Sequence, residues 1–281
     1  MTKQAPIRTR SWLFTPATRP ERFAKASQAG ADVAILDLED AVAPADKAHA
    51  RTIALNYLEG GSAEGALHAL RINGLDTLAG VSDLDALLRS PAAPDLLVLP
   101  KTETAGHLQI LDRLLTAAGK DTGLIGLIES ARGLAAVEAI AAATPRLAGL
   151  MLGAADMAAD LGATVAWRPL LALVSGRLIT ACALAGVMPV DSPFFDLRDE
   201  PGLKQEVAGA VAFGFSAKAA IHPVQIGAIN AAFTPSAEEV ERAREILAEN
   251  MKGVGTVDGK MIDEAVARKA RHTLAAAGIP D

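Results

Sequence analysis

The stretch DLLVLPKTETAGHLQILDRLLTAAGKDTGLIGLIES, residues 95–130, contains two short apolar runs separated by an amphipathic segment. The runs Leu96–Lys101 and Leu124–Glu129 are almost wholly apolar up to their last residue, which is typical of strands buried on both faces. The segment Leu108–Ala118 between them carries apolar residues at helical spacing. A strand, a helix and a second strand in this order predict a parallel βαβ unit.

The same alternation recurs about every 30 residues on either side of this unit, which is the usual length of one βαβ repeat. The predicted strands are Ser11–Pro16, Val33–Asp40, Leu67–Asn73, Leu96–Lys101, Leu124–Glu129, Gly149–Gly153, Met188–Asp191 and Lys218–His222. The predicted helices are Arg19–Ala29, Asp46–Leu58, Leu78–Arg89, Leu108–Ala118, Leu134–Ala143, Pro169–Ala185, Gly202–Phe213 and Ile226–Phe233.

Eight such units close naturally into a barrel, so we expect an α/β fold, a TIM (β/α)8 barrel, over residues 8–234. A doubly wound open sheet is the alternative. The first strand is not followed by the G-x-G-x-x-G turn that such sheets often carry, which favours the barrel.

The pattern changes after Pro235. A charged helix is predicted at Ala237–Asn250, followed by the glycine-rich stretch Gly253–Gly259 and a last helix at about Asp263–Ala277. No further strand of the barrel kind is predicted there. We therefore expect residues 235–281 to form a C-terminal helical cap or arm that packs on a neighbouring subunit, rather than a second domain.

The composition excludes several classes of protein. A net charge of −6 argues against binding to nucleic acid, because phosphate contacts need clustered Lys and Arg. The single cysteine, Cys182, rules out an internal disulfide and predicts a cytoplasmic location. The segment Met1–Arg10 lacks the apolar region of a signal peptide. No uncharged apolar run reaches about 18 residues, so we expect no membrane span.

Polar residues gather where the predicted strands end. In a parallel barrel these ends converge on one rim, and the active site lies there. The ends carry Phe14–Pro16, Asp37–Asp40, Arg71–Asn73, Pro100–Lys101, Glu129–Ser130, Ala155–Asp156, Asp191–Ser192 and His222–Pro223. Asp, Glu, Lys and Arg are seldom buried unless they are paired or bind a metal, so the pattern predicts a charged pocket rich in carboxylates.

Several carboxylates at one rim repel each other unless a cation lies among them. Mg²⁺ fits best, since it takes one or two protein carboxylates and leaves positions for water and substrate oxygens. Glu129 and Asp156 are the preferred candidate ligands, and Arg71 is the candidate for stabilising a developing oxyanion. Zinc is disfavoured, because the histidines show no ligand spacing and the one cysteine falls within a predicted helix.

Each of these residues also has a structural interpretation. Glu129 and Asp156 could be anions that stabilise helix N-termini, and Arg71 could be a buried ion-pair partner. The remaining alternatives are ion pairs of Glu39 and Asp40 with Arg22 or Lys47, a solvated or carboxylate-paired Lys101, a structural His222, loop or subunit-contact roles for Asp191 and Asp196, and a solvated helix face for Arg19, Arg22 and Lys25.

Eight short motifs, in order, resemble the citrate lyase β-subunit-like proteins of the HpcH/HpaI aldolase family, over about residues 8–275. They are RSWLFTP (10–16), RPER (19–22), DLEDAV (37–42), RIN (71–73), LPK (99–101), IESARG (128–133), GFSAK (214–218) and IHPVQ (221–225). The resemblance implies a trimeric or hexameric barrel that acts on citryl, malyl, citramalyl or related thioesters.

By the same resemblance, Glu129 and Asp156 would bind Mg²⁺, and Arg71 would contact the substrate. The resemblance further implies water-mediated metal contacts for Glu39 and Asp40, and a coenzyme A site at Phe14, Arg19, Arg22 and Lys25. The segment GKMID, residues 259–263, matches a C-terminal motif whose acidic residue lies over a neighbouring subunit's barrel, so Asp263 is the candidate catalytic acid or base.

Two positions depart from the family pattern: Ala155 precedes Asp156 where relatives usually have Glu, and Asp263 is followed by Glu264-Ala265 instead of Ser-Pro.

The expected activity is a Mg²⁺-dependent cleavage, or formation, of a 3-hydroxyacyl-CoA thioester into an acyl-CoA and a 2-oxo acid. Asp263 would protonate the departing thioester enolate. The alternatives are a metal-dependent 2-oxo acid aldolase that needs no coenzyme A, a malyl-CoA thioesterase or malate synthase-like activity, and an inactive structural subunit.

Overall fold

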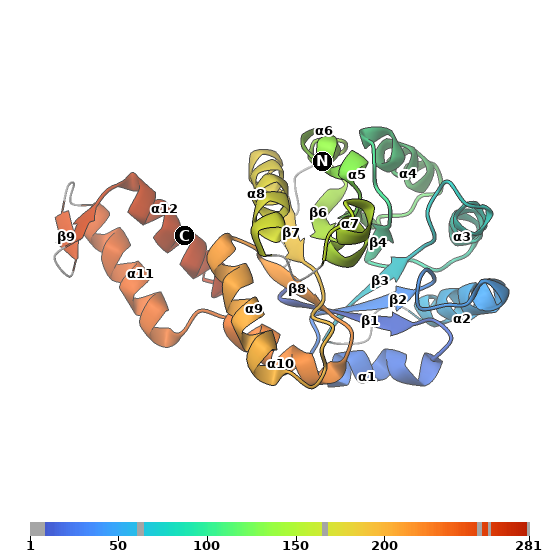
Figure 1. Cartoon of the computed structure of the whole chain (residues 1–281), viewed down its shortest axis with the longest axis horizontal. Helices are drawn as coiled ribbons and strands as arrows, with labels where there is room; N and C mark the ends of the chain where they lie inside the picture. The colour runs from blue at the N-terminus through green and yellow to red at the C-terminus, as the bar shows by residue number, and fades with distance from the viewer. Residues whose placement is uncertain (1–8, 61–64, 165–167, 252–254, 258–259, 280–281) are drawn as a thin grey trace. The chain divides into compact units, whose positions relative to one another are not determined.

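Eight parallel strands close into a barrel in sequential order in the computed structural model, with β1 hydrogen-bonded to both β2 and β8 (Figure 1). The structure describes residues 9–60, 65–164, 168–251, 255–257 and 260–279. The strands are β1 (Ser11–Pro16), β2 (Val33–Asp37), β3 (Leu67–Arg71), β4 (Leu96–Leu99), β5 (Gly123–Ile128), β6 (Leu147–Leu152), β7 (Met188–Asp191) and β8 (Ala217–Ala220). The predicted TIM barrel is confirmed.

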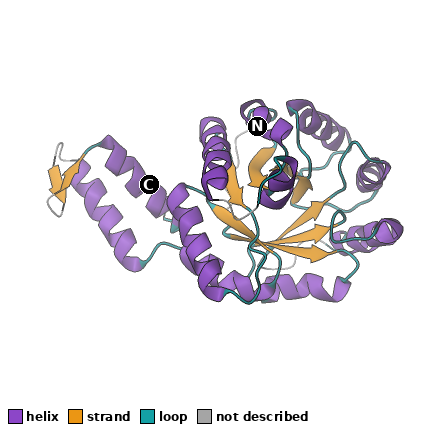
Figure 2. Cartoon of the chain, viewed as in Figure 1, coloured by secondary structure: helices purple, strands orange, loops and turns teal. Residues whose placement is uncertain are grey.

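Helices form the outer layer around these strands (Figure 2). They are α1 (Phe23–Gln28), α2 (Lys47–Leu58), α3 (Leu78–Arg89), α4 (Ala105–Ala117), α5 (Ala131–Ala135), α6 (Val137–Ala141), α7 (Ala154–Asp160), α8 (Arg168–Ala185), α9 (Glu200–Phe213) and α10 (Ile226–Ala232). Three 3-10 helices, η1 (Pro20–Arg22), η2 (Pro44–Asp46) and η3 (Pro223–Gln225), begin with proline, which suits a first helical turn.

Alternate residues of every strand fill the barrel interior. The interior cluster includes Ile35 of β2, Ala69 of β3 and Leu127 of β5, all buried. Side chains alternate between the two faces of a strand, so the residue two positions further on points into the same interior. Those residues are Asp37, Arg71 and Glu129, at the carboxyl ends. The apolar core and the charged rim are therefore formed by residues on the same, inward-pointing face of the strands.

The helix α7 was not predicted. It follows β6 after a single residue, Gly153, and spans only seven residues, Ala154–Asp160. A helix of two turns is too short to show a clear apolar period. Its position matters, because its first turn carries Asp156.

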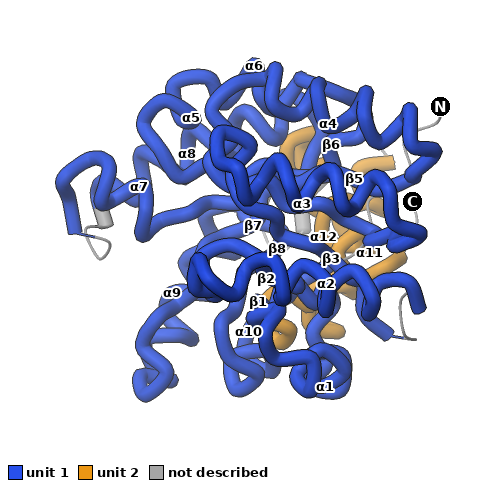
Figure 3. The backbone as a smooth tube through the Cα atoms, turned by 90° about the vertical axis from the view of Figure 1, so that its right-hand side faces the viewer, with its two compact units in different colours: residues 1–229 blue, residues 230–281 orange. Residues whose placement is uncertain are grey.

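The chain divides into two compact units, Met1–Ile229 and Asn230–Asp281 (Figure 3). Within the second unit α11 (Ala237–Asn250) and α12 (Glu264–Ala276) pack through Ala243, Ala270 and Leu274. Two short antiparallel strands, β9 (Gly255–Val257) and β10 (Lys260–Ile262), differ in kind from the barrel strands. Much of the predicted glycine-rich stretch, including Gly253 and Gly259, lies outside the described residues.

In the described residues, none of the helices combines the length and the apolar character needed to cross a membrane.

Candidate active site

Asp37 and Arg71 form a two-point ion pair inside the barrel rim. Arg71 donates from Nε to Oδ1 of Asp37 at 2.7 Å and from Nη2 to Oδ2 at 2.6 Å. Asp37 also accepts the backbone N–H groups of Glu39 and Ala41, which turns the chain sharply after β2. The pair therefore fixes the Arg71 guanidinium and places Glu39 beside it.

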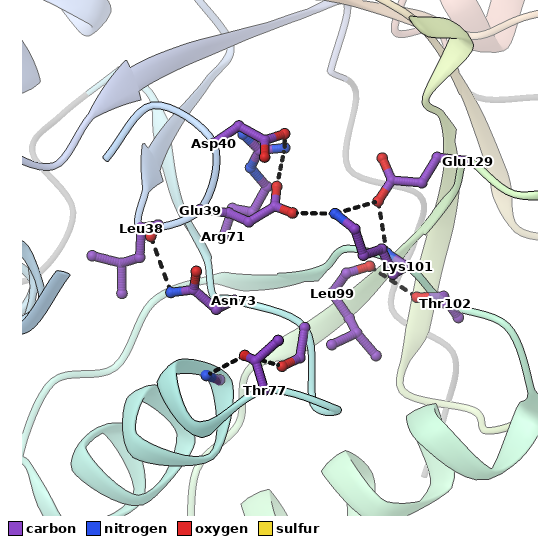
Figure 4. A network of polar contacts seen from close by, with 12 residues as sticks. Leu38, Glu39, Asp40, Arg71, Asn73, Thr77, Leu99, Lys101, Thr102 and Glu129 are labelled. Carbon is purple, nitrogen blue, oxygen red and sulfur yellow. Dashed lines mark hydrogen bonds and ion pairs between the residues drawn. The ribbon is translucent and has the colours of Figure 1, made fainter. Parts of the chain in front are cut away.

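The free edge of the Arg71 guanidinium faces more carboxylates. Its Nη1 lies 2.8 Å from Oε2 of Glu39, without hydrogen-bond geometry, and 3.6 Å from Oδ2 of Asp40 (Figure 4). The guanidinium carbon also lies 4.7 Å from the centre of the Phe14 ring, a cation–π contact. Burial alone would lower the pKa of Arg71, but the carboxylates of Asp37, Glu39 and Asp40 outweigh it and raise that pKa.

Lys101 links Glu39 to Glu129. Its Nζ donates to Oε1 of Glu39 at 2.6 Å and lies 3.9 Å from Oε1 of Glu129, while its backbone N–H donates to that same Glu129 oxygen at 2.7 Å (Figure 4). Burial tends to lower the pKa of Lys101, but Glu39 and Glu129 raise it overall. Negative and positive groups thus alternate across the rim, from Asp37 through Arg71, Glu39 and Lys101 to Glu129.

Glu129 is 4% exposed and stands at the end of β5. Burial raises the pKa of its carboxyl to about 7; the Lys101 N–H opposes this shift, and the charges of Glu39 and Asp156 add to it. Gly153 makes room for the carboxylate, since a Cβ at that position would lie 2.5 Å from the Glu129 Cβ. The sequence motif around Glu129 gave no hint of this packing.

Asp156 lies in the first turn of α7, exposed to solvent, and its charge acts on Glu129. The charges of the two predicted ligands therefore influence each other. Arg71 binds Asp37, and Lys101 binds Glu39 and lies 3.9 Å from Glu129. Glu129 and Asp156 repel each other, and two carboxylates of this kind suit a hard divalent cation.

Among the described residues there is no cluster of three or more His, Cys, Asp or Glu side chains that could hold a metal. Mg²⁺ commonly takes one or two protein carboxylates and keeps its other positions for water and substrate. Glu129 and Asp156 thus fit Mg²⁺ by donor type, number and charge.

The predicted alternative partners of Glu39 are wrong. Its carboxylate contacts Arg71 and Lys101, not Arg22 or Lys47. Lys47 donates instead to the backbone carbonyls of Leu38 and Glu39, so it holds the loop rather than the carboxylate. Lys101 is paired with carboxylates, one of the two environments predicted for it.

The remaining predicted site residues are Phe14, Arg19, Arg22, Lys25 and Asp263. Arg19 precedes η1, Arg22 ends η1 and Lys25 lies on α1, and all three side chains are exposed. The buried side of α1 is formed by Phe23 and Ala26. Phe14, grouped with them in the prediction, instead contacts Arg71. Asp263, in the second unit, accepts the N–H of Val266 and so caps α12.

Asp191 is the last residue of β7, not a loop residue. Its carboxylate accepts a 2.6 Å hydrogen bond from Lys218, whose side chain is fully buried and also contacts Glu206 of α9 at 2.7 Å. Strand alternation places Lys218 on the helix-facing side of β8, opposite to the interior residues Ala217 and Ala219. This ion cluster fastens α9 to the barrel.

Residues Asp37, Lys101 and Gly153 were not predicted individually as site residues. Asp37 could have been found from strand alternation, since it shares the face of Ile35. Lys101 and Gly153 act through backbone conformation and close packing, which no sequence pattern here signals.

Comparisons with known proteins identify the family of the chain. Residues 10–223 match the model of the HpcH/HpaI aldolase/citrate lyase family, and residues 175–279 match that of a C–C bond lyase of the TIM-barrel fold. The chain is 36% identical to an L-malyl-CoA/β-methylmalyl-CoA lyase of Cereibacter sphaeroides, covering 93% of this chain and 92% of the relative.

Two solved structures are similar. RipC from Yersinia pestis is 58% identical with a TM-score of 0.75, over 84% of this chain and 100% of that one. The CitE protein from Mycobacterium tuberculosis, in complex with magnesium, acetoacetate and coenzyme A, is 36% identical with a TM-score of 0.82, over 98% of this chain and 100% of that one. Because the family match spans most of the chain, the protein belongs to the HpcH/HpaI aldolase/citrate lyase family.

Proposed function

We propose that the protein is a Mg²⁺-dependent carbon–carbon lyase that cleaves, or forms, a 3-hydroxyacyl-CoA thioester. The products of cleavage would be an acyl-CoA and a 2-oxo acid. The observation that carries the proposal is the buried Glu129 carboxylate at the same rim as the fixed guanidinium of Arg71, with Asp156 in the first turn of α7, the helix that begins after Gly153. The similar lyase acts on malyl-CoA and β-methylmalyl-CoA, and the similar CitE structure contains magnesium and coenzyme A.

Glu129 and Asp156 would hold the metal. Bound Mg²⁺ supplies Lewis-acid stabilisation to the oxygens of a 2-hydroxy or 2-oxo acid. Glu39 and Asp40 would orient water at the rim. Arg71 keeps its charge in the low-dielectric interior. Its Nε and Nη2 are held by Asp37, and its Nη1 faces Glu39 and Asp40 at the rim, where it would meet a substrate oxygen.

Asp263 is the proposed proton donor to the departing enolate. Its carboxylate already accepts a hydrogen bond from the backbone of Val266, which fixes its orientation at the start of α12. We propose further that residues 235–281 act as an arm on a neighbouring subunit of a trimer or hexamer, so that Asp263 serves the barrel of another copy.

Coenzyme A would bind near the exposed cations Arg19, Arg22 and Lys25. Within the part of the chain that the structure describes, Arg22 is exposed and its ion-pair contact is a weak one, at 4.0 Å, with Glu21, so its guanidinium is available to a phosphate. A cytoplasmic location would suit a protein whose one cysteine, Cys182, is buried and unpaired.

The test is a panel of malyl-, citramalyl-, β-methylmalyl-, citryl- and hydroxymethylglutaryl-CoA, each assayed with Mg²⁺ and with a chelator. Mg²⁺-dependent release of an acyl-CoA and a 2-oxo acid from at least one thioester is the expected result. Cleavage of a free 4-hydroxy-2-oxo acid without coenzyme A would point to the 2-oxo acid aldolase alternative. Hydrolysis to free coenzyme A without carbon–carbon cleavage would point to a thioesterase.

A further inference from the structure

The ammonium group of Lys101 occupies the space between two carboxylates. It lies 2.6 Å from Oε1 of Glu39 and 3.9 Å from Oε1 of Glu129. Glu39 and Glu129 are both almost completely buried, so neither charge is screened well by water. A positive charge is therefore already placed where two negative groups would otherwise repel each other.

The backbone of Lys101 is shaped for this position. Its φ angle is +49°, the left-handed region, and no other non-glycine residue in the described ranges has a positive φ. A lysine adopts this conformation at an energetic cost, and such residues cluster where the surroundings hold them in place at functional sites. Here the conformation directs the N–H onto Glu129 and the side chain back towards Glu39.

The Glu39 carboxylate is held from two sides. Oε2 faces Arg71 at 2.8 Å, and Oε1 is bound by Lys101. If the ammonium were absent, Arg71 would still hold Oε2, while Oε1 would remain at the rim without a cation. Lys101 Nζ is near both Oε1 of Glu39 and Oε1 of Glu129, so the two carboxylates face the same ammonium group, and without it Glu39 would have no cation on the side of Glu129.

We propose that Lys101 is a positioning residue that keeps Glu39 from becoming a third carboxylate ligand of the metal. The ion then has two protein carboxylates, Glu129 and Asp156, and the remaining positions stay open for substrate oxygens. This inference rests on the metal site of the proposed function. It explains why a lysine stands in a strained backbone position within a network that serves a cation.

The test is Mg²⁺ binding to the purified protein without substrate, measured by isothermal titration calorimetry at pH 8.5. In Lys101→Met, Glu39 gains access to the ion, and the affinity of oxygen-ligand sites rises with the number of charged ligands, so we expect binding about tenfold tighter than wild type. The turnover of thioester should fall and its KM should rise, because a position for substrate oxygen is filled. Unchanged or weaker Mg²⁺ binding overturns the proposal.

A double variant identifies the added ligand. If Glu39 supplies it, Lys101→Met combined with Glu39→Gln should lose the gain and bind Mg²⁺ as the wild type does. A double variant that keeps the tighter binding contradicts the proposal. Lys101→Arg retains a cation beside Glu39 and should keep the wild-type affinity.

Lys204→Met is the matched control for the loss of one lysine charge. Lys204 is exposed on α9, where it pairs with Glu200 at 2.7 Å, so Mg²⁺ binding should not change. If Lys101→Met proves unstable by thermal unfolding, Lys101→Gly replaces it, because glycine adopts φ +49° without strain.

The wild-type titration separates the two hypotheses. If the wild type binds no Mg²⁺ and Glu129→Gln changes nothing, the metal site itself fails. If the wild type binds Mg²⁺ and Lys101→Met does not tighten it, only the role of Lys101 fails.

Discussion

Gly153 lies so close to Glu129 that a Cβ on the glycine would be 2.6 Å from Oε2 of the carboxylate. Gly153 is the last residue before α7, and Asp156 follows in the first turn of that helix. The missing side chain therefore lets the two proposed metal ligands approach each other. Gly153 therefore belongs to the proposed metal site, although it contributes no ligand.

Gly153→Ala should weaken Mg²⁺ binding about 10- to 100-fold, the usual effect of disturbing a group that orients a metal ligand. The added methyl must displace either the Glu129 carboxylate or the start of α7. Calorimetry on the variant measures the effect. Gly209→Ala is the control, because Gly209 lies on α9 with no atom within 4 Å of an added Cβ, and it should leave Mg²⁺ binding intact.

The pH dependence of Mg²⁺ binding follows from Glu129, whose pKa is raised to about 7 in the absence of metal. The cation binds the ionised carboxylate, so below pH 7 binding must release a proton. The apparent affinity should fall by up to about tenfold per pH unit below that value and level off above it. Titrations in buffers of different ionisation enthalpy count the released protons. Affinity that is constant between pH 5.5 and 8 contradicts this assignment.

Much of the fold was predictable because each strand is a short apolar run. The predicted ranges Ser11–Pro16, Leu78–Arg89 and Ala237–Asn250 match the observed elements residue for residue. Six strands end one to three residues earlier than predicted, at Asp37, Arg71, Leu99, Ile128, Leu152 and Ala220, since the residues beyond them form the rim loops. The apolar pattern locates a strand, but it does not mark the residue at which the strand's hydrogen-bonded pairing ends and the loop begins.

The site was predictable only where residue type carried the signal. Glu129, Asp156, Arg71 and Glu39 were found because carboxylates and arginine are unusual at the ends of buried strands. Lys101 was recognised as a possible partner of carboxylates, but its left-handed backbone depends on contacts from other strands. Conformation imposed by tertiary packing leaves no mark in the local sequence.

Lys218→Met should destabilise the fold by about 3–5 kcal/mol, because it leaves Asp191 without its buried partner. Lys218 has no exposed surface and connects β7, β8 and α9 through Asp191 and Glu206. Urea unfolding measures the loss, with the exposed Lys204→Met expected within about 0.5 kcal/mol of wild type. Equal effects of the two substitutions would falsify the structural role of Lys218.

His68 should make the protein sensitive to acid. It is 1% exposed on β3, both ring nitrogens lack hydrogen-bond partners, and its ring packs 5.2 Å from that of Tyr57. Burial lowers the pKa of His68 below its ordinary value of 6.5, with Asp95 opposing the shift.

The sign follows from proton binding. Between the lowered pKa and 6.5 the unfolded chain binds a proton that the folded chain excludes, so stability is lost as the pH falls below 6.5. His68→Phe keeps an aromatic ring against Tyr57 and removes the titration. Its free energy of unfolding should therefore change less than that of wild type between pH 7 and pH 5. Parallel curves for the two proteins would assign the acid sensitivity to other groups.

Two substitutions of Asp263 can separate its proposed catalytic role from its role in capping α12. Asp263→Ala removes both the carboxyl and the cap on α12, and loss of a cap alone costs about 0.5–2 kcal/mol. Asp263→Asn keeps an oxygen that can accept the N–H of Val266 but cannot donate the proton of a carboxylic acid. If Asp263 protonates the enolate, turnover should fall about 100-fold or more in both variants, while only Asp263→Ala loses stability. Near-normal turnover in Asp263→Asn would leave the residue with its capping role alone.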